Sequence, residues 1–305
     1  MMLRNEWREA DRIEVSMTNF MQRLEAAWAS RYVDPKAMQP SHDDARTPVC
    51  VVTGGSEGIG RYLAEEFAGD GHALLLIARS EDNLQQAASE LRRLHGVDVH
   101  IAPLDLAASD AVEQVQAALD SHGLYAEHFV NNAAFGIGGP FVEQDADRLM
   151  RLVALNIGAL TALTRHFLPG MLKRQRGGVL NVASIGGLLP GPYQAAYYAS
   201  KAYVMSLTEA LAHEYAGLGV RIAAAAPGPV HTEFHKRMGV NAAHYLEMSG
   251  GMSAERAARL IYAGYICRRR VIVPGFFASL AAFAVRYIPH VVLVPFIGWL
   301  IKRRY

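Results

Sequence analysis

TGGSEGIG, residues 53–60, is the stretch that decides the fold of this chain of 305 residues. The apolar residues just before it predict a buried strand, and residues 60–68 have the pattern of a helix. Glycines allow a tight turn between the two and let a ligand approach the backbone closely. The free N–H groups and positive dipole end of a helix N-terminus bind phosphate. The stretch therefore predicts a strand–turn–helix unit that binds the pyrophosphate of a dinucleotide.

The alternation of short apolar runs and helical stretches continues from this unit to residue 273. Strands are predicted at residues 49–53, 73–78, 97–102, 129–131, 178–183, 221–226 and 271–273. Helices are predicted at residues 60–68, 82–94, 109–121, 145–174, 195–216 and 253–268. Buried strands joined by right-handed helical crossovers form a parallel sheet with helices on both faces. We therefore expect an α/β, doubly wound fold of the Rossmann type around a seven-stranded parallel sheet.

Extensions flank this unit, so the chain divides into residues 1–46, 47–274 and 275–305. Apolar residues recur at helical spacing in the first extension, at Ile13, Met17, Phe20, Met21, Leu24 and Trp28. They predict a helix that packs on its own domain or on a partner subunit, with a membrane or a foreign protein as the alternative contact.

The last extension is apolar and predicted to be helical, with Pro289 and Pro295 breaking any long helix. Each half is too short to span a bilayer. One interpretation is that residues 275–305 pack over the substrate pocket or a dimer partner. The other is that they lie in a membrane surface, with the basic end Lys302-Arg303-Arg304 on anionic lipid.

Composition excludes several classes of function. Basic and acidic residues nearly balance, at 30 and 29, so no global field points to nucleic acid. Two cysteines do not make a disulfide framework, and no metal-ligand spacing is present. The N-terminus lacks the apolar core of a signal peptide. We expect a cytoplasmic protein without a metal or a nucleic-acid partner, with peripheral membrane association through residues 275–305 left open.

The end of the second predicted strand selects between the two nicotinamide cofactors. An NAD site usually places a carboxylate there to hold the ribose 2′-OH. This chain has Arg79 and Ser80 instead, which can donate hydrogen bonds to a 2′-phosphate. NADP is therefore favoured over NAD.

Asp105 lies at the end of the third predicted strand, where the adenine ring would lie. Its carboxylate can accept a hydrogen bond from the adenine amine, or it can cap the next helix.

Tyr197 and Lys201 are a second informative pair, and Ser184 lies upstream of them. Residues four apart on a helix lie on one face, one turn from each other. An ammonium about 4 Å from a phenol stabilises the phenolate by roughly 4 kcal/mol at an effective dielectric constant near 20. The phenol pKa then falls below its ordinary value of about 10. A tyrosine of this kind exchanges protons with an alcohol or ketone. Taken alone, the pair also fits a solvated helix face.

Taken together and in order, these motifs resemble the short-chain dehydrogenase/reductase family over residues 47–274. The matching positions are T-G-x-x-x-G-x-G at 53–60, the N-N-A-G stretch at 131–134, Asn156, Ser184, Tyr197 with Lys201, and Pro227-Gly228 followed by Val230 and Thr232. Ala134 stands where the family usually has glycine. Glu57 stands where some NADP-preferring members carry a basic residue. Similar hydrophobic tails occur in members resembling long-chain and hydroxysteroid dehydrogenases.

The resemblance implies that one compact domain holds both the cofactor and the catalytic residues. It assigns catalysis to Asn156, Ser184, Tyr197 and Lys201. With the patterns above, it assigns cofactor binding to Gly54, Ser56, Glu57, Gly58, Ile59, Gly60, Arg79, Ser80, Asp105, Leu106, Asn132, Ala133, Ala134, Tyr197, Lys201, Pro227, Gly228, Val230 and Thr232. Asn156 would hold a water that relays protons from Lys201, or would bond a backbone group. The family usually pairs through its long central helices, so a homodimer or homotetramer is expected.

Residues 233–251 occupy the position of the substrate lid in this family. Apolar residues there and beside the predicted site are Phe234, Met238, Val240, Tyr245, Leu246, Met248, Phe135, Ile137, Ile185, Leu188 and Leu189. They favour a lipid-like, steroid-like or aromatic ketone over a sugar.

The predicted function is an NADP(H)-dependent carbonyl reductase or alcohol dehydrogenase. The alternative is a non-catalytic NADP(H)-binding sensor or scaffold. An epimerase or dehydratase of the related longer fold is disfavoured by the three residues between Gly54 and Gly58.

Overall fold

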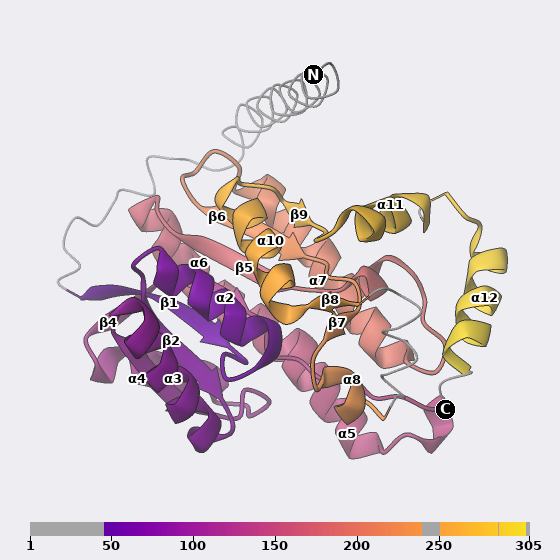
Figure 1. The fold of residues 1–305 in the computed structure, drawn as a ribbon, viewed down its shortest axis with the longest axis horizontal. Coiled ribbons are helices and arrows are strands. Elements are labelled where there is room, and N and C mark those ends of the chain that lie inside the picture. The colour runs from indigo at the N-terminus through magenta and orange to yellow at the C-terminus, as the bar shows by residue number, and fades with distance from the viewer. Residues whose placement is uncertain (1–45, 240–250, 286, 303–305) are drawn as a thin grey trace.

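A seven-stranded parallel sheet forms the centre of the computed structural model, which describes residues 46–239, 251–285 and 287–302 (Figure 1). Its strand order is β3-β2-β1-β4-β5-β6-β9. The strands are β1 (Thr47–Thr53), β2 (Ala73–Ala78), β3 (Val99–Pro103), β4 (Leu124–Asn131), β5 (Gly178–Val182), β6 (Arg221–Ala225) and β9 (Val271–Ile272). The order reverses between β1 and β4, which is where doubly wound folds bind ligands. The predicted fold class is confirmed.

Helices cover both faces of the sheet because neighbouring residues of each buried strand point in opposite directions. In β1, Cys50 and Val52 pack with α2 (Gly58–Gly69), α3 (Glu81–His95) and α10 (Ala254–Ile266). Val49 and Val51 pack on the other face. That face is covered by α4 (Ala111–Ser121), α6 (Leu160–Arg174) and α7 (Ala195–Glu214). Both faces are therefore buried, as the continuous apolar runs predict.

The helix predicted at residues 145–174 contains an interruption. It consists of α5 (Ala146–Val153), a π-helical turn (Ala154–Ala159) and α6, which follow one another without a loop. Such π turns are rare and occur mostly at functional sites. The turn carries Asn156, one of the residues predicted to be catalytic.

Short elements border the carboxyl ends of the strands. They are the 3-10 turns Phe141–Glu143 and Ile185–Leu188, the helix α8 (Phe234–Arg237), and the two-stranded sheet of β7 (Val230–His231) and β8 (Met252–Ser253). The predicted lid residues Val240, Tyr245, Leu246 and Met248 lie outside the described residues, as does the apolar stripe of residues 13–28.

The C-terminal extension forms two helices, α11 (Phe276–Val285) and α12 (His290–Lys302). Pro289 precedes α12, but Pro295 lies inside it, so the prediction that Pro295 breaks the helix is wrong. A proline inside a helix removes one backbone hydrogen bond. Leu293 and Ile301 of α12 are nevertheless buried. Within the described ranges, no helix combines the length and apolar character needed to cross a bilayer.

Candidate active site

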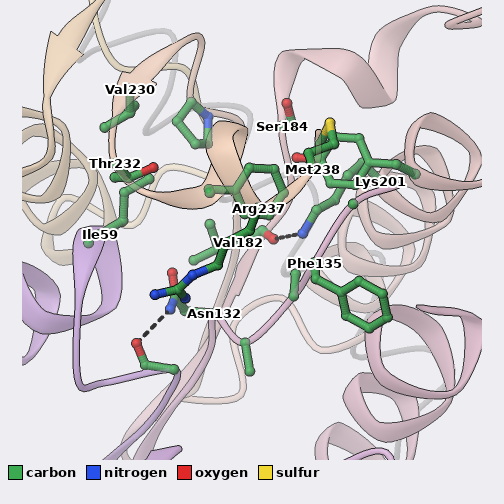
Figure 2. Close-up of a pocket in the computed structure, with 18 of the residues that line it drawn as sticks. Ile59, Asn132, Phe135, Val182, Ser184, Lys201, Val230, Thr232, Arg237 and Met238 are labelled. Carbon is green, nitrogen blue, oxygen red and sulfur yellow. Dashed lines mark hydrogen bonds between the residues drawn. The ribbon is translucent and has the colours of Figure 1, made fainter. Parts of the chain in front are cut away.

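A cleft of about 1810 Å³ lies at the carboxyl ends of the strands. Its walls contain every residue predicted for the site except Gly60 and Asn156. The predicted residues that line it are Gly54, Ser56, Glu57, Gly58, Ile59, Arg79, Ser80, Asp105, Leu106, Asn132, Ala133, Ala134, Ser184, Tyr197, Lys201, Pro227, Gly228, Val230 and Thr232. Figure 2 shows Ile59, Val230 and Thr232 on one side of the cleft, and Ser184 and Lys201 on another. Residues far apart in the sequence are therefore brought into one cavity.

The ends of β1 and β4 are joined by side-chain hydrogen bonds. The Thr53 hydroxyl accepts from the backbone N–H groups of Asn132 and Ala133, at 2.9 and 3.0 Å. The Asn132 amide donates to the backbone oxygens of Thr53 and Gly54, at 3.0 and 3.2 Å. These bonds hold the glycine-rich turn against the end of the neighbouring strand.

Gly60 lies behind the cleft wall and has a packing role. A Cβ atom at this position would lie 2.2 Å from the Gly54 backbone oxygen and 2.3 Å from the Asn132 amide nitrogen. A backbone atom cannot move aside as a flexible side chain can. Only glycine therefore lets α2 begin this close to the turn, and Gly54 itself has a left-handed φ of 64°.

The chemistry of the walls fits a nicotinamide dinucleotide. Glu57 is the N-cap residue of α2 and makes no capping hydrogen bond, and the first turn of this 12-residue helix contains no acid. The backbone N–H groups in the first turn of α2 are therefore available to bind a phosphate. Arg79 and Ser80 reach the cleft from the end of β2, and both are exposed. Positive charge at this end of the cleft matches a ribose 2′-phosphate.

Asp105 is engaged by protein groups. One carboxylate oxygen accepts from the Ala107 backbone N–H at 3.1 Å, and the other pairs with Arg151 at 2.6 Å. Partial burial would raise the pKa of Asp105, but these hydrogen bonds hold it below its ordinary value. Asp105 does not cap the next helix, as one of its two predicted roles required, because Asp110 is the N-cap residue of α4 and the bond to Ala107 lies in the loop before it.

Lys201 is a buried lysine inside the cleft wall. Its Nζ donates to the Val182 backbone oxygen at 2.8 Å, a bond drawn in Figure 2, and lies 5.8 Å from the centre of the Tyr197 ring. Burial lowers the pKa of Lys201 to about 8. Tyr197 and Lys201 are both carried by α7, as the four-residue spacing predicts. Ser184 follows β5, and its hydroxyl accepts from the Gly186 backbone N–H at 3.1 Å.

Asn156 is almost fully buried, and its amide joins three segments. The side-chain nitrogen donates to the Phe135 backbone oxygen at 2.9 Å and to the Ser200 hydroxyl at 3.1 Å. The side-chain oxygen accepts from the Phe135 backbone N–H at 3.2 Å. Both amide hydrogens are therefore used by the protein. Of the two roles predicted for Asn156, the bond to a backbone group is the one present.

The helix α8 and the following Met238 line the cleft and contact three other segments of the chain. The Phe234 ring lies 5.4 Å from the Tyr197 ring. The Arg237 guanidinium forms a two-point ion pair with Glu57, in which Nη2 and Oε2 are 2.8 Å apart. The Met238 backbone oxygen accepts from Gly138 at 3.1 Å. Figure 2 shows Arg237 and Met238 directed into the cavity.

Sequence reasoning missed Arg237 and Arg151 as cleft residues. Arg237 pairs with a residue 180 positions earlier, and Arg151 with one 46 positions earlier. Local patterns carry no signal for such distant pairs. Glu57 alone pointed to a basic partner, because an acidic residue is unusual in a turn that is expected to bind phosphate.

The pKa of Lys201 leads to a prediction about stability. The ordinary pKa of lysine, 10.5, applies to the unfolded chain, and the folded value is about 8. Between these pH values the unfolded chain holds a proton that the folded protein lacks. The free energy of unfolding therefore rises with pH across this window, by about 3 kcal/mol in all.

Replacing Lys201 with Met should remove this rise. Chemical denaturation at several pH values between 7.5 and 10.5 would measure the difference between wild type and Lys201→Met. The exposed lysine variant Lys236→Met controls for loss of a positive charge. Parallel stability profiles for wild type and Lys201→Met would contradict the lowered pKa.

Known proteins share this architecture. Residues 48–242 match the family model described as short chain dehydrogenase. The chain is 34% identical to the very-long-chain 3-oxoacyl-CoA reductase of Mus musculus over 190 residues, 61% of this chain and 60% of the relative. The chain therefore spans about 60% of the length of that relative.

Two solved structures are similar over most of their length. A short-chain dehydrogenase from Sphingobium yanoikuyae in complex with NADPH is 30% identical, with a TM-score of 0.70 over 78% of this chain and 92% of that one. L-Sorbose reductase from Gluconobacter frateurii, complexed with NADPH and L-sorbose, is 28% identical, with a TM-score of 0.64 over 77% and 96%. The matched family model, the parallel sheet and the cleft lead to one conclusion: the chain belongs to the short-chain dehydrogenase family.

Proposed function

We propose that the protein is an NADP(H)-dependent oxidoreductase that interconverts a ketone or aldehyde with the corresponding alcohol, on an apolar substrate. One observation carries the proposal: a single cleft contains the glycine-rich turn, Arg79 and the group of Ser184, Tyr197 and Lys201. A non-catalytic sensor or scaffold would not need Ser184, Tyr197 and Lys201 in the same cavity.

In the reductive direction a bound NADPH supplies the hydride that reaches the carbonyl carbon. The Tyr197 hydroxyl donates a proton to the carbonyl oxygen, so that the product is a neutral alcohol. The Ser184 hydroxyl donates a hydrogen bond to the same oxygen and fixes its position. The Lys201 ammonium favours the phenolate that Tyr197 becomes and binds the nicotinamide ribose. Val230 and Thr232 would hold the carboxamide group of the nicotinamide.

Several features support NADP over NAD. Arg79 and Ser80 occupy the position where an NAD site would have a carboxylate. Glu57 would repel a phosphate, but its pairing with Arg237 offsets its charge. Two solved relatives are named as complexes with NADPH.

The substrate end of the cleft is apolar. Its walls there include Phe135, Ile185, Leu189, Phe234, Met238, Ala278, Ala281, Ile297, Leu300 and Ile301. Apolar walls with a few polar groups at the reacting end suit a long hydrocarbon substrate better than a sugar. The relatives named as very-long-chain 3-oxoacyl-CoA reductases act on molecules of that class.

A panel of ketones tests the function and the substrate class together. Consumption of NADPH would be followed by absorbance with methyl ketones of increasing chain length and with L-sorbose. We expect kcat/KM to rise about tenfold or more from short to long chains, since each buried methylene contributes about 0.8 kcal/mol. L-Sorbose should give the lowest value. NADPH binding without consumption on any ketone would favour the non-catalytic alternative, and preference for L-sorbose would overturn the apolar class.

A further inference from the structure

Exposed apolar side chains gather on the two C-terminal helices. Phe276, Leu280 and Phe283 form a stripe along α11, and Val292, Phe296 and Trp299 form a stripe along α12. The spacing i, i+4, i+7 places each set on one helix face. Phe283 is 60% exposed and Phe296 is 55% exposed, and Val291 of α12 is 80% exposed. Figure 1 shows α11 at the upper right of the molecule and α12 along its right-hand edge. Apolar patches of this kind mark interaction sites.

The charges of the same segment have one sign. Residues 271–305 contain no Asp or Glu, and their charged residues are Arg286, Lys302, Arg303 and Arg304. The chain as a whole is balanced, at 30 basic and 29 acidic residues, so the segment differs from the rest. Apolar side chains next to basic ones complement a surface of anionic lipid. If this face paired with the same face of a second copy, the basic residues of the two segments would repel each other, and no acidic residue of the segment could offset their charge.

The helices are too short to cross a bilayer. At 1.5 Å per residue, the 10 residues of α11 span about 15 Å and the 13 of α12 about 20 Å, against about 30 Å of hydrocarbon. An apolar helix face that cannot span the hydrocarbon can still be buried at the boundary between headgroups and acyl chains.

The other sides of the two helices reach the active-site cleft. Ala278 and Ala281 of α11, and Ile297, Leu300 and Ile301 of α12, line the cavity that contains Tyr197. One pair of helices thus contributes apolar side chains both to the outer surface and to the substrate wall. An apolar molecule dissolved in a bilayer would meet these helices first.

We propose that the outer faces of α11 and α12 dock on an anionic lipid bilayer, and that the apolar substrate enters the cleft from the bilayer. The docking surface is defined by Leu280, Phe283, Val291, Val292 and Phe296. The entry route rests on the proposed function, because it concerns the same cleft. Docking itself does not depend on catalysis.

Sedimentation of the full chain with vesicles tests docking. We expect the protein to pellet with vesicles of phosphatidylglycerol and phosphatidylcholine, and less with phosphatidylcholine alone or at high salt. The double variant Phe283→Asp/Phe296→Asp should bind about tenfold more weakly, since it removes two inserting rings and adds two repelled charges. Val142→Asp is the matched control, because Val142 is 91% exposed outside this surface.

The outcomes are distinct. Wild type left in the supernatant, or equal losses in Phe283→Asp/Phe296→Asp and Val142→Asp, would overturn the docking surface. Analytical ultracentrifugation tests whether a second copy of the chain binds this surface instead. If wild type forms an oligomer and does not bind vesicles, and the double variant is a monomer, the surface is an interface between copies and the docking proposal is overturned.

A long-chain ketone embedded in vesicles tests entry. The double variant should reduce it about tenfold more slowly than wild type, while a water-soluble ketone is reduced at the same rate by both. Equal rates on the embedded ketone would overturn entry from the bilayer. If wild type consumed no NADPH with any ketone, the proposed function would be refuted. Binding of wild type to vesicles would in that case still support the docking surface.

Discussion

Replacing Tyr197 with Phe is expected to lower kcat by about 10²–10⁴-fold, the range that a positioned proton donor contributes. The variant keeps the aromatic ring, so its contact with Phe234 at 5.4 Å is retained. Lys201 also keeps its bond to the Val182 backbone oxygen, because that bond does not involve Tyr197. The change therefore removes the hydroxyl and little else. Steady-state rates with a ketone, together with calorimetric titration of NADPH, would separate catalysis from binding.

The matched control is Tyr203→Phe on the same helix. The Tyr203 hydroxyl is bonded to Thr161 at 3.0 Å and does not line the cleft. Its loss should leave kcat within about twofold of wild type, as expected for a surface substitution within about 0.5 kcal/mol. A Tyr197→Phe protein that kept more than about a tenth of the wild-type rate would exclude Tyr197 as the proton donor.

Replacing Arg79 with Ala should weaken NADPH binding by roughly 1.5–3 kcal/mol, or about 10–150-fold, the range for hydrogen bonds to charged groups. NADH lacks the 2′-phosphate, so its affinity should barely change. The side chain is exposed at the end of β2, where its removal leaves no buried group without a partner. Titration of both cofactors by calorimetry or fluorescence gives the ratio directly.

Arg93→Ala serves as the control for charge loss near this region. Arg93 is exposed on α3 but outside the cleft, and its loss should leave both affinities unchanged. Equal weakening of NADPH and NADH by Arg79→Ala would show that Arg79 contacts a part common to both cofactors, and would refute its 2′-phosphate role.

The fold was predictable where one side-chain pattern decided each element. Strand β1 and helix α2 follow from an apolar run, a glycine-rich turn and a helical stretch, all within residues 47–69.

The prediction for β4 was too short, because only its last three residues were recognised. Glu127 and His128 interrupt its apolar pattern, yet both are buried. Arg176 pairs with Glu127 at 2.7 Å, and the Tyr265 hydroxyl bonds to His128 at 2.8 Å.

The cleft residues that follow the ends of successive strands were predictable as neighbours from the sequence. Parallel strands bring their carboxyl ends to one edge of the sheet, so Thr53, Arg79, Asp105, Asn132 and Ser184 had to lie near one another. The position of α8 was not predictable in the same way. Its contacts depend on where a short helix lies across the cleft, and its partner Glu57 belongs to the other half of the sheet. The division of the chain at residues 46 and 274 stays a prediction.

The cleft is lined by two parts of the chain, one inside the segment that the family model matches and one beyond it. Ser184, Tyr197 and Lys201 are carried by elements fixed to the central sheet. Much of the apolar lining comes instead from α11 and α12, near the end of the chain. The family model stops at residue 242, before α11 begins. A chain cut after residue 242 would therefore keep Ser184, Tyr197 and Lys201 but lose the walls that α11 and α12 contribute to the cavity.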